Sequence, residues 1–228
     1  MSELFYVPAD GPPESVSVRT GSHSDYSHRF GGEIRHKGAT FAGCDRPLTL
    51  LYTFDLADPS VRPKIPGVRF LPLFNGLRFD SSPVYYGIKS DDEIEILRQD
   101  RTKFTPSFPY TNYPDTFPEL SVSLGPAEPI HYDQDVRDTW QSWAWPDKQP
   151  RDPDKNEVIQ CHDLIYNGGI HECVNPNCRL SNVNYLAAFH DEWLHDQGVS
   201  IWGGYEDVVI VYYLCYSCFT VSAFNLVN

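Results

Sequence analysis

Proline is the residue that most constrains the fold of this chain, because 19 prolines are spread over its 228 residues. A proline inside a helix removes a hydrogen bond and collides with the preceding turn, and inside a central strand it removes a ladder bond. Long helices are therefore disfavoured, and we expect short strands joined by loops. Prolines are frequent from Thr105 to Pro153, where regular elements should be short.

Apolar runs bounded by turn residues predict the strands. They are Ser15–Arg19, Leu48–Leu56, Val68–Leu77, Val84–Ile88 and Glu93–Leu97, followed by two final strands that flank Cys215 and Cys218. The sequence His28-Arg29-Phe30-Gly31-Gly32 predicts a sharp turn, because glycine adopts positive φ without a steric penalty. Two short helices are predicted, at Val136–Trp145 and Asp191–His195. The fold class that we expect is α+β, with strand predominating.

One domain is expected to span residues 1–228, since a chain of this length can bury a sizeable core. The charged, proline-rich segment Lys148–Lys155 is the best candidate for an internal boundary. Residues 156–228 would then form the metal-binding part, with a zinc-ribbon-like knuckle near the C-terminus.

The net charge is −13, from 31 acidic and 18 basic residues. Such a surface repels phosphate backbones, so we expect no nucleic-acid partner. The acidity suits a basic protein partner and equally serves solubility. A small basic cluster does not outweigh it; its members are Arg29, Arg35, His36 and Lys37.

The chain is expected to be cytoplasmic. Its first residues lack the basic and apolar regions of a signal peptide, and its longest apolar run, Val208–Cys215, is far shorter than the ~20 residues of a membrane helix. Thiols stay reduced in the cytoplasm, where closely spaced cysteines more often hold metal than form disulfides.

Two cysteine pairs predict a structural zinc site. Four residues separate Cys173 from Cys178, and two separate Cys215 from Cys218. Zinc favours four thiolates in a tetrahedron, and a tight turn presents two sulfurs to one ion. The alternatives are that the second pair is a redox dithiol or a chance pair of buried strand cysteines. The other nearby residues that could replace one ligand are Cys161, His162 and His171.

The motif from His28 to Gly32 and the strand after it resemble the opening of the YwqG-like family of bacterial proteins. The C-terminal cysteines, with Trp202-Gly203-Gly204 between the pairs, resemble a zinc-carrying branch of that family. The resemblance is confined to residues 28–56 and 168–228. It departs from the family after Gly32, where Glu33 to His36 replace the usual Trp and Gln. The resemblance implies a protein without established enzymatic activity, some of whose relatives look like partners of toxins.

From these observations we expect a non-enzymatic, zinc-stabilised binding protein. The resemblance implies that this protein is an immunity protein, which neutralises a basic toxin by binding it. The alternative is a hydrolase or other enzyme with a site built from scattered polar residues such as His28, His36 and Asp55. The sequence holds no motif that assigns an oligomeric state or a substrate.

Overall fold

The computed structural model describes residues 3–6, 14–20, 24–77, 79, 83–98, 115–129, 173–178, 183–190 and 208–227. These residues form eleven β-strands and no helix. The strands are β1 Glu3–Tyr6, β2 Glu14–Thr20, β3 Arg29–Phe30, β4 Thr49–Asp55, β5 Phe70–Asn75, β6 Val84–Ser90, β7 Glu93–Arg98, β8 Leu120–Pro129, β9 Val183–His190, β10 Val208–Cys215 and β11 Thr220–Val227. A helix of the length and apolar character needed to cross a membrane does not occur among them.

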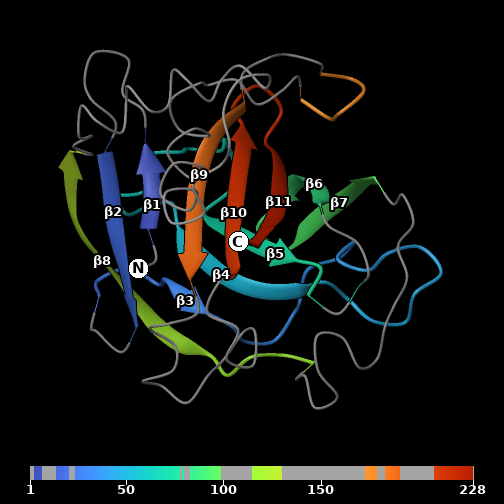
Figure 1. Ribbon diagram of the computed structural model, residues 1–228, viewed down its shortest axis with the longest axis horizontal. Helices are drawn as coiled ribbons and strands as arrows, with labels where there is room; N and C mark the ends of the chain where they lie inside the picture. Colours follow the sequence, from blue (N-terminus) through green and yellow to red (C-terminus); the bar gives the residue numbers. More distant parts are fainter. Residues whose placement is uncertain are drawn as a thin grey trace, which may run out of the picture.

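The strands belong to one sheet in the order β5-β4-β3-β8-β2-β1-β9-β10-β11-β6-β7 (Figure 1). Every pairing between named strands is antiparallel. Strands β9, β10 and β11 are inserted between β1 and β6, so strands from before and after the predicted boundary at 148–155 share the sheet. The boundary segment itself lies outside the described residues.

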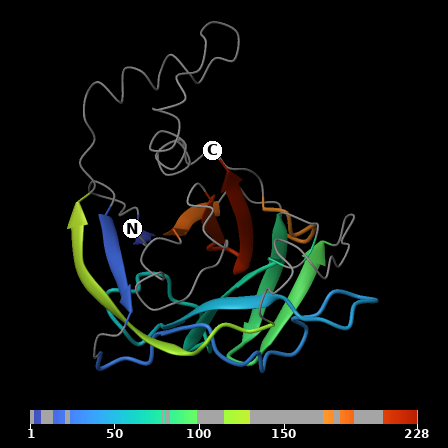
Figure 2. The same cartoon turned by 60° about the horizontal axis from the view of Figure 1, so that its bottom comes forward.

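The sheet curls until β4 and β5 lie across the other strands (Figure 2). The ring of Tyr52 in β4 stacks on Phe189 in β9 with 4.0 Å between ring centroids. The hydroxyl of Tyr86 in β6 accepts a hydrogen bond from the backbone N–H of Phe74 and donates one to the carbonyl of Pro72, both in β5 and both at 3.0 Å. These contacts close the main core between the two halves of the sheet.

All residues of β4 are buried. A continuous apolar strand is what a position covered on both faces requires, because neither set of alternating side chains reaches water. The strongest strand predicted from the sequence, Leu48–Leu56, is therefore confirmed, and it forms the centre of the core.

The other predicted strands are confirmed with shifts of one or two residues at their ends. They correspond to β2, β5, β6 and β7, and the two final strands correspond to β10 and β11. The prediction that the class is α+β has no support among the described residues, which are β-rich. Both predicted helices, Val136–Trp145 and Asp191–His195, lie outside the described residues.

Strand β8 contradicts the expectation that the proline-rich segment holds only short elements, because it has ten residues. It pairs with β3 only through Leu120 and Ser121, so most of its length has β2 as a single neighbour. Pro126 falls where the register with β2 shifts. Prolines are tolerated at such bulges and unpaired edges, where the missing N–H is not needed.

The turn predicted at Gly31 and Gly32 is confirmed, since their φ angles are 65° and 92°. A side chain on Gly31 would collide with the carbonyl oxygen of Pro118. Glycine is required there both for the left-handed backbone and for this close approach, which places β3 between β4 and β8.

Candidate metal centre

The first cysteine pair lies in a tight turn before β9. The backbone N–H of Cys178 donates to the carbonyl of Asn175 at 2.9 Å. The Asn175 side chain also accepts from the N–H of Asn177 at 3.0 Å, and Pro176 lies between them. Proline and asparagine favour such turns because proline presets φ and the asparagine side chain replaces a backbone acceptor. The turn that the sequence predicts here is confirmed.

The second pair lies in the turn between β10 and β11. Cys215 is the last residue of β10, and its carbonyl accepts a hydrogen bond from Phe219 N–H at 2.8 Å. Phe219 has a φ of 57°, which is a costly left-handed conformation for a bulky residue. Cys215 also pairs with Val183, the first residue of β9, so the loop that precedes β9 lies beside this turn.

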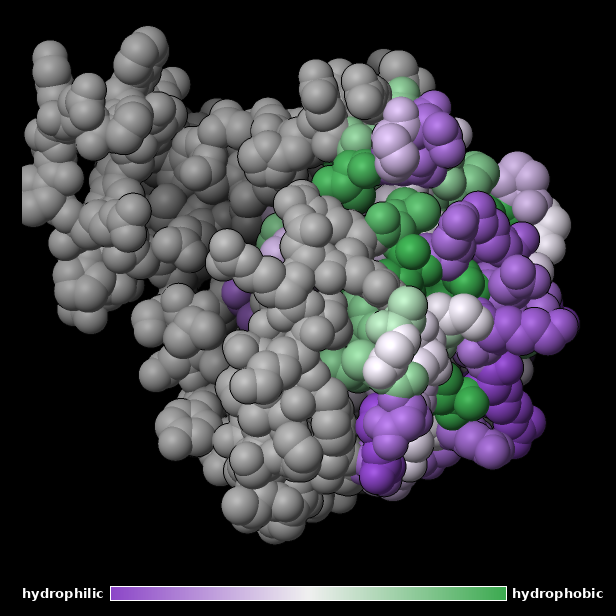
Figure 3. All heavy atoms as spheres, turned by 90° about the vertical axis from the view of Figure 1, so that its right-hand side faces the viewer, coloured by the Kyte–Doolittle hydropathy of each residue, from purple (hydrophilic) through white to green (hydrophobic). Residues whose placement is uncertain are grey.

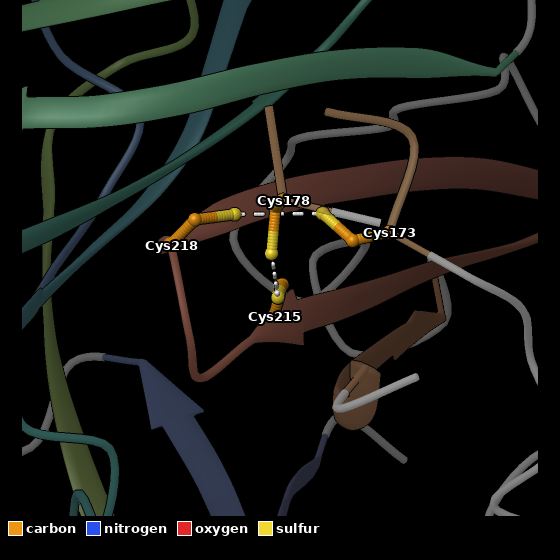
Figure 4. A group of neighbouring side chains, drawn as sticks. All are labelled: Cys173, Cys178, Cys215 and Cys218. Carbon is orange, nitrogen blue, oxygen red and sulfur yellow. Dashed lines mark hydrogen bonds between the residues drawn. The ribbon is translucent and has the colours of Figure 1, made fainter. Parts of the chain in front are cut away.

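The four sulfur atoms converge on one another (Figure 4). All lie within 4.8 Å of one another. Cys173 Sγ is 3.4 Å from Cys218 Sγ, and Cys178 Sγ is 3.8 Å from Cys215 Sγ. A disulfide would require about 2.05 Å between sulfurs, so these are free thiols.

These separations match a four-sulfur metal site. A zinc–sulfur bond of about 2.3 Å places the sulfurs of a tetrahedron about 3.8 Å apart. Four thiols at such distances, with no carboxylate in the group, form the donor set that zinc favours. The predicted residues Cys173, Cys178, Cys215 and Cys218 are therefore brought together as one possible metal site. The alternative ligands Cys161, His162 and His171 lie outside the described residues.

Neighbouring groups hydrogen-bond the sulfurs and shift their acidity. Burial, the largest influence, raises the pKa of Cys173 to about 12. Burial acts in the same direction on Cys218, but hydrogen bonds from the Thr220 hydroxyl at 3.1 Å and from the Cys173 thiol lower its pKa to about 7. The backbone N–H groups of Asn175 and Thr220 also bond to the sulfurs two residues before them. Such bonds stabilise thiolates and orient metal ligands.

The cysteines belong to a second hydrophobic cluster that is distinct from the main core. In β10 the side chains alternate, so Ile210, Tyr212 and Leu214 join the main core. Val211, Tyr213 and Cys215 point to the opposite face and join the second cluster, which also contains Cys173, Val183 and Ala188. Exposed and buried side chains do not alternate along β10, because both faces of this strand are covered.

The residues suggested for an enzymatic site form a structural network instead. The buried ring of His28 accepts a hydrogen bond at Nδ1 from the backbone N–H of Asp55 (3.0 Å). Its Nε2 lies 2.8 Å from a carboxylate oxygen of Asp58. Because a backbone N–H only donates, Nδ1 must be the acceptor, and Nε2 carries the hydrogen that Asp58 receives.

Asp55 is fully buried, and its carboxylate accepts from several donors. Arg69 binds it with two nitrogens, at 3.2 and 3.0 Å, and the N–H groups of Ser27 and Ala57 donate to it at 3.3 and 3.0 Å. The bonds with Arg69 are the main reason that the pKa of Asp55 falls to about 2. Every oxygen of this carboxylate is thus engaged in holding the loop after β4.

His36, the third residue suggested for an enzymatic site, lies apart from His28 and Asp55. Its ring packs edge-on against Phe74 at 5.1 Å, and burial lowers its pKa. The structure therefore brings His28 and Asp55 together but does not add His36 to them. Sequence reasoning missed the roles of Asp58 and Arg69, which contact His28 and Asp55 only in the folded chain.

The comparisons with known proteins gave no match of this chain to a family model, to a curated protein or to a solved structure.

Proposed function

We propose that Cys173, Cys178, Cys215 and Cys218 bind one zinc ion, and that the ion has a structural role. The observation that carries this proposal is the convergence of four thiols within 4.8 Å from two separate turns. Four thiolates complete the coordination of tetrahedral zinc, so no position remains for water or substrate. The ion then ties the 173–178 loop to the β10–β11 turn.

Elemental analysis of the purified protein is the direct test, with one zinc per chain as the expected result. Cys215→Ser should lose the metal and melt at a lower temperature. Structural zinc contributes on the order of 10 kcal/mol in isolated finger peptides, and less is expected here because the main core is separate from the site.

Cys44→Ser is the matched control. Cys44 is also a free, half-buried cysteine, but it is outside the group of four. Its substitution should leave the zinc content unchanged. A wild-type protein without zinc, or a Cys215→Ser variant that retains it, contradicts the proposal.

We further propose that this chain functions by binding a basic protein partner and not by catalysing a reaction. The net charge of −13 supports an attraction to a basic partner, although most of the excess negative charge lies outside the described residues. The engagement of His28 and Asp55 in structural bonds also favours this function over the enzyme alternative. The resemblance to YwqG-like proteins makes a bacterial toxin the expected partner.

Within the described surface, acidic side chains are gathered at the turn between β6 and β7. Asp91, Asp92, Glu93 and Glu95 are all exposed there. On the right-hand side of Figure 1, which faces the viewer in Figure 3, hydrophilic side chains lie beside hydrophobic ones on the described surface. We refer to Asp91, Asp92, Glu93 and Glu95 as the acidic turn.

The association rate with a partner isolated from the native host tests this function. The rate should fall steeply as salt rises, because charges separated by more than ~10 Å are screened at 0.1 M salt. Glu93→Gln should slow association. Glu33→Gln is the control, since Glu33 is also exposed but pairs with Arg35 at 3.0 Å. An acidic partner, or a rate that ignores salt, contradicts the proposal.

A further inference from the structure

We propose that peroxide oxidises the four-cysteine centre to a disulfide between Cys173 and Cys218, which releases the metal and leaves the 173–178 loop covalently tied to the β10–β11 hairpin. This inference rests on the proposed zinc centre and adds a regulated state to it. The sequence alone suggests a redox dithiol at Cys215 and Cys218 as an alternative; the disulfide proposed from the structure joins different cysteines.

The arrangement of the sulfurs favours a bond between the two turns. Two short sulfur–sulfur contacts join one turn to the other: Cys173 to Cys218 at 3.4 Å and Cys178 to Cys215 at 3.8 Å. The shorter of these two contacts, between Cys173 and Cys218, comes nearer to the disulfide length of about 2.05 Å.

Access decides which sulfur reacts first. Cys173 and Cys215 are buried, with 4% and 0% exposure, whereas Cys178 and Cys218 are half-buried. Of the two accessible sulfurs, Cys218 lies 3.4 Å from the Cys173 sulfur, against 3.8 Å between Cys178 and Cys215, and it is hydrogen-bonded by the Thr220 hydroxyl at 3.1 Å. A thiolate that is accessible and beside a resolving thiol is the arrangement that oxidation selects.

The chemistry balances with hydrogen peroxide as the oxidant. The Cys218 thiolate attacks one peroxide oxygen, the O–O bond breaks, and a sulfenic acid and hydroxide form. The Cys173 thiolate then attacks the Cys218 sulfur; the S–S bond forms, the S–O bond breaks, and the hydroxide that leaves takes a proton from solvent to become water. Two thiolates lose two electrons and the peroxide gains them. Zinc is not redox-active and leaves because two of its thiolate ligands are gone.

The sequence offers a direct readout of the pairing. Trypsin cleaves after Lys155 and Arg179, and no Lys or Arg follows Arg179. Residues 156–179, which carry Cys161 as well as Cys173 and Cys178, therefore become separate from residues 180–228, which carry Cys215 and Cys218. A disulfide between the turns joins the two peptides, whereas a disulfide between Cys215 and Cys218 leaves them separate.

The experiment treats the full-length zinc protein with graded hydrogen peroxide, follows zinc release with a chromogenic chelator, and maps disulfides by non-reducing digestion and tandem mass spectrometry. We expect the joined peptides, a Cys173–Cys218 bond, and zinc release in step with its formation. Cys44→Ser should give the same products, because Cys44 lies outside the group. A Cys215–Cys218 bond, a bond that uses Cys161, or unchanged thiols after zinc release overturns the inference.

Metal analysis before oxidation separates this inference from the proposed function. A protein that contains no zinc at the start refutes the zinc centre, and the disulfide map of the same sample still tests the pairing. A zinc protein that forms only the Cys215–Cys218 bond refutes the pairing and leaves the zinc centre intact.

Discussion

Asp55 shows how one buried carboxylate holds a loop in place. It is fully buried, paired with Arg69 and hydrogen-bonded by two backbone N–H groups. Asp55→Asn removes the charge that these donors require, and we expect the free energy of unfolding to fall by about 2 kcal/mol. The measurement is chemical denaturation of the variant and the parent.

Asp115→Asn is the matched control for Asp55→Asn. Asp115 also pairs with an arginine, Arg46, at 2.6 Å, but both side chains are about half exposed. The loss should stay below about 1 kcal/mol, because solvent screens an exposed pair. Equal losses at the two sites would show that burial does not strengthen the Asp55 pair.

The same carboxylate predicts a direction for acid denaturation. Its bonds with Arg69 lower the pKa of Asp55 in the folded protein from 3.8 to about 2. A pKa that is lower in the folded state contributes stability above pH 3.8, and this contribution is lost as the pH falls toward 2. Asp55→Asn should therefore reduce the slope of stability against pH between about 4 and 2. A slope identical to that of the parent would contradict this assignment.

At the scale of elements, Gly38 lies where an N-terminal segment contacts β7. The N–H of Lys37 donates to Asp92, and the N–H of Ile94 donates to Lys37, at 2.8 and 3.0 Å. Gly38 has a φ of 77°, and a Cβ there would collide with the carbonyl oxygen of Ile94. Gly38→Ala should therefore lower the melting temperature strongly, because the segment must separate from β7.

Gly43→Ala isolates the collision from the backbone strain. Gly43 has the same φ of 77°, but a Cβ there meets nothing within 4 Å. Its cost should be only that of the left-handed conformation, about 1–2 kcal/mol. If the two alanine variants have equal stability, the close approach of Gly38 to β7 has no energetic importance.

Local sequence pattern predicts strands well where both faces of an element are buried or turn residues bound it, as at β4 and at Gly31. It also predicts the cysteine group, because the spacing within each pair is local. Pattern failed at β8, where a bulge and an unpaired edge accommodate Pro126. It could not find the His28–Asp58 bond, because that contact joins residues thirty apart and depends on the curl of the sheet.

At the scale of the whole molecule, the two hydrophobic clusters predict an uneven response to metal removal. The four cysteines belong to or pack against the second cluster, while β4 belongs to the main core. After chelation of zinc, amide hydrogen exchange should accelerate around Cys215 and Thr220 and change little in β4, because local opening follows local stability. Hydrogen-exchange mass spectrometry with and without chelator measures this.

Uniform acceleration over all strands would show instead that the zinc site and the sheet unfold as one unit. No change at the β10–β11 turn would show that the site is dispensable for its own surroundings. Cys44→Ser, treated in the same way, controls for an effect of the chelator on the main core.

The position of β9, β10 and β11 in the sheet determines when the earlier strands can complete their pairing during synthesis. β1 pairs with β2 and β6 with β7, but their second neighbours are β9 and β11, so one edge of each early strand finds its partner only after a long stretch of chain has been made. At ~5–20 residues per second, the ribosome needs on the order of tens of seconds between them. During that time β6 has an open edge and the main core lacks Phe189 and Tyr212. Until β11 has emerged, β6 therefore presents an edge that another chain could pair with.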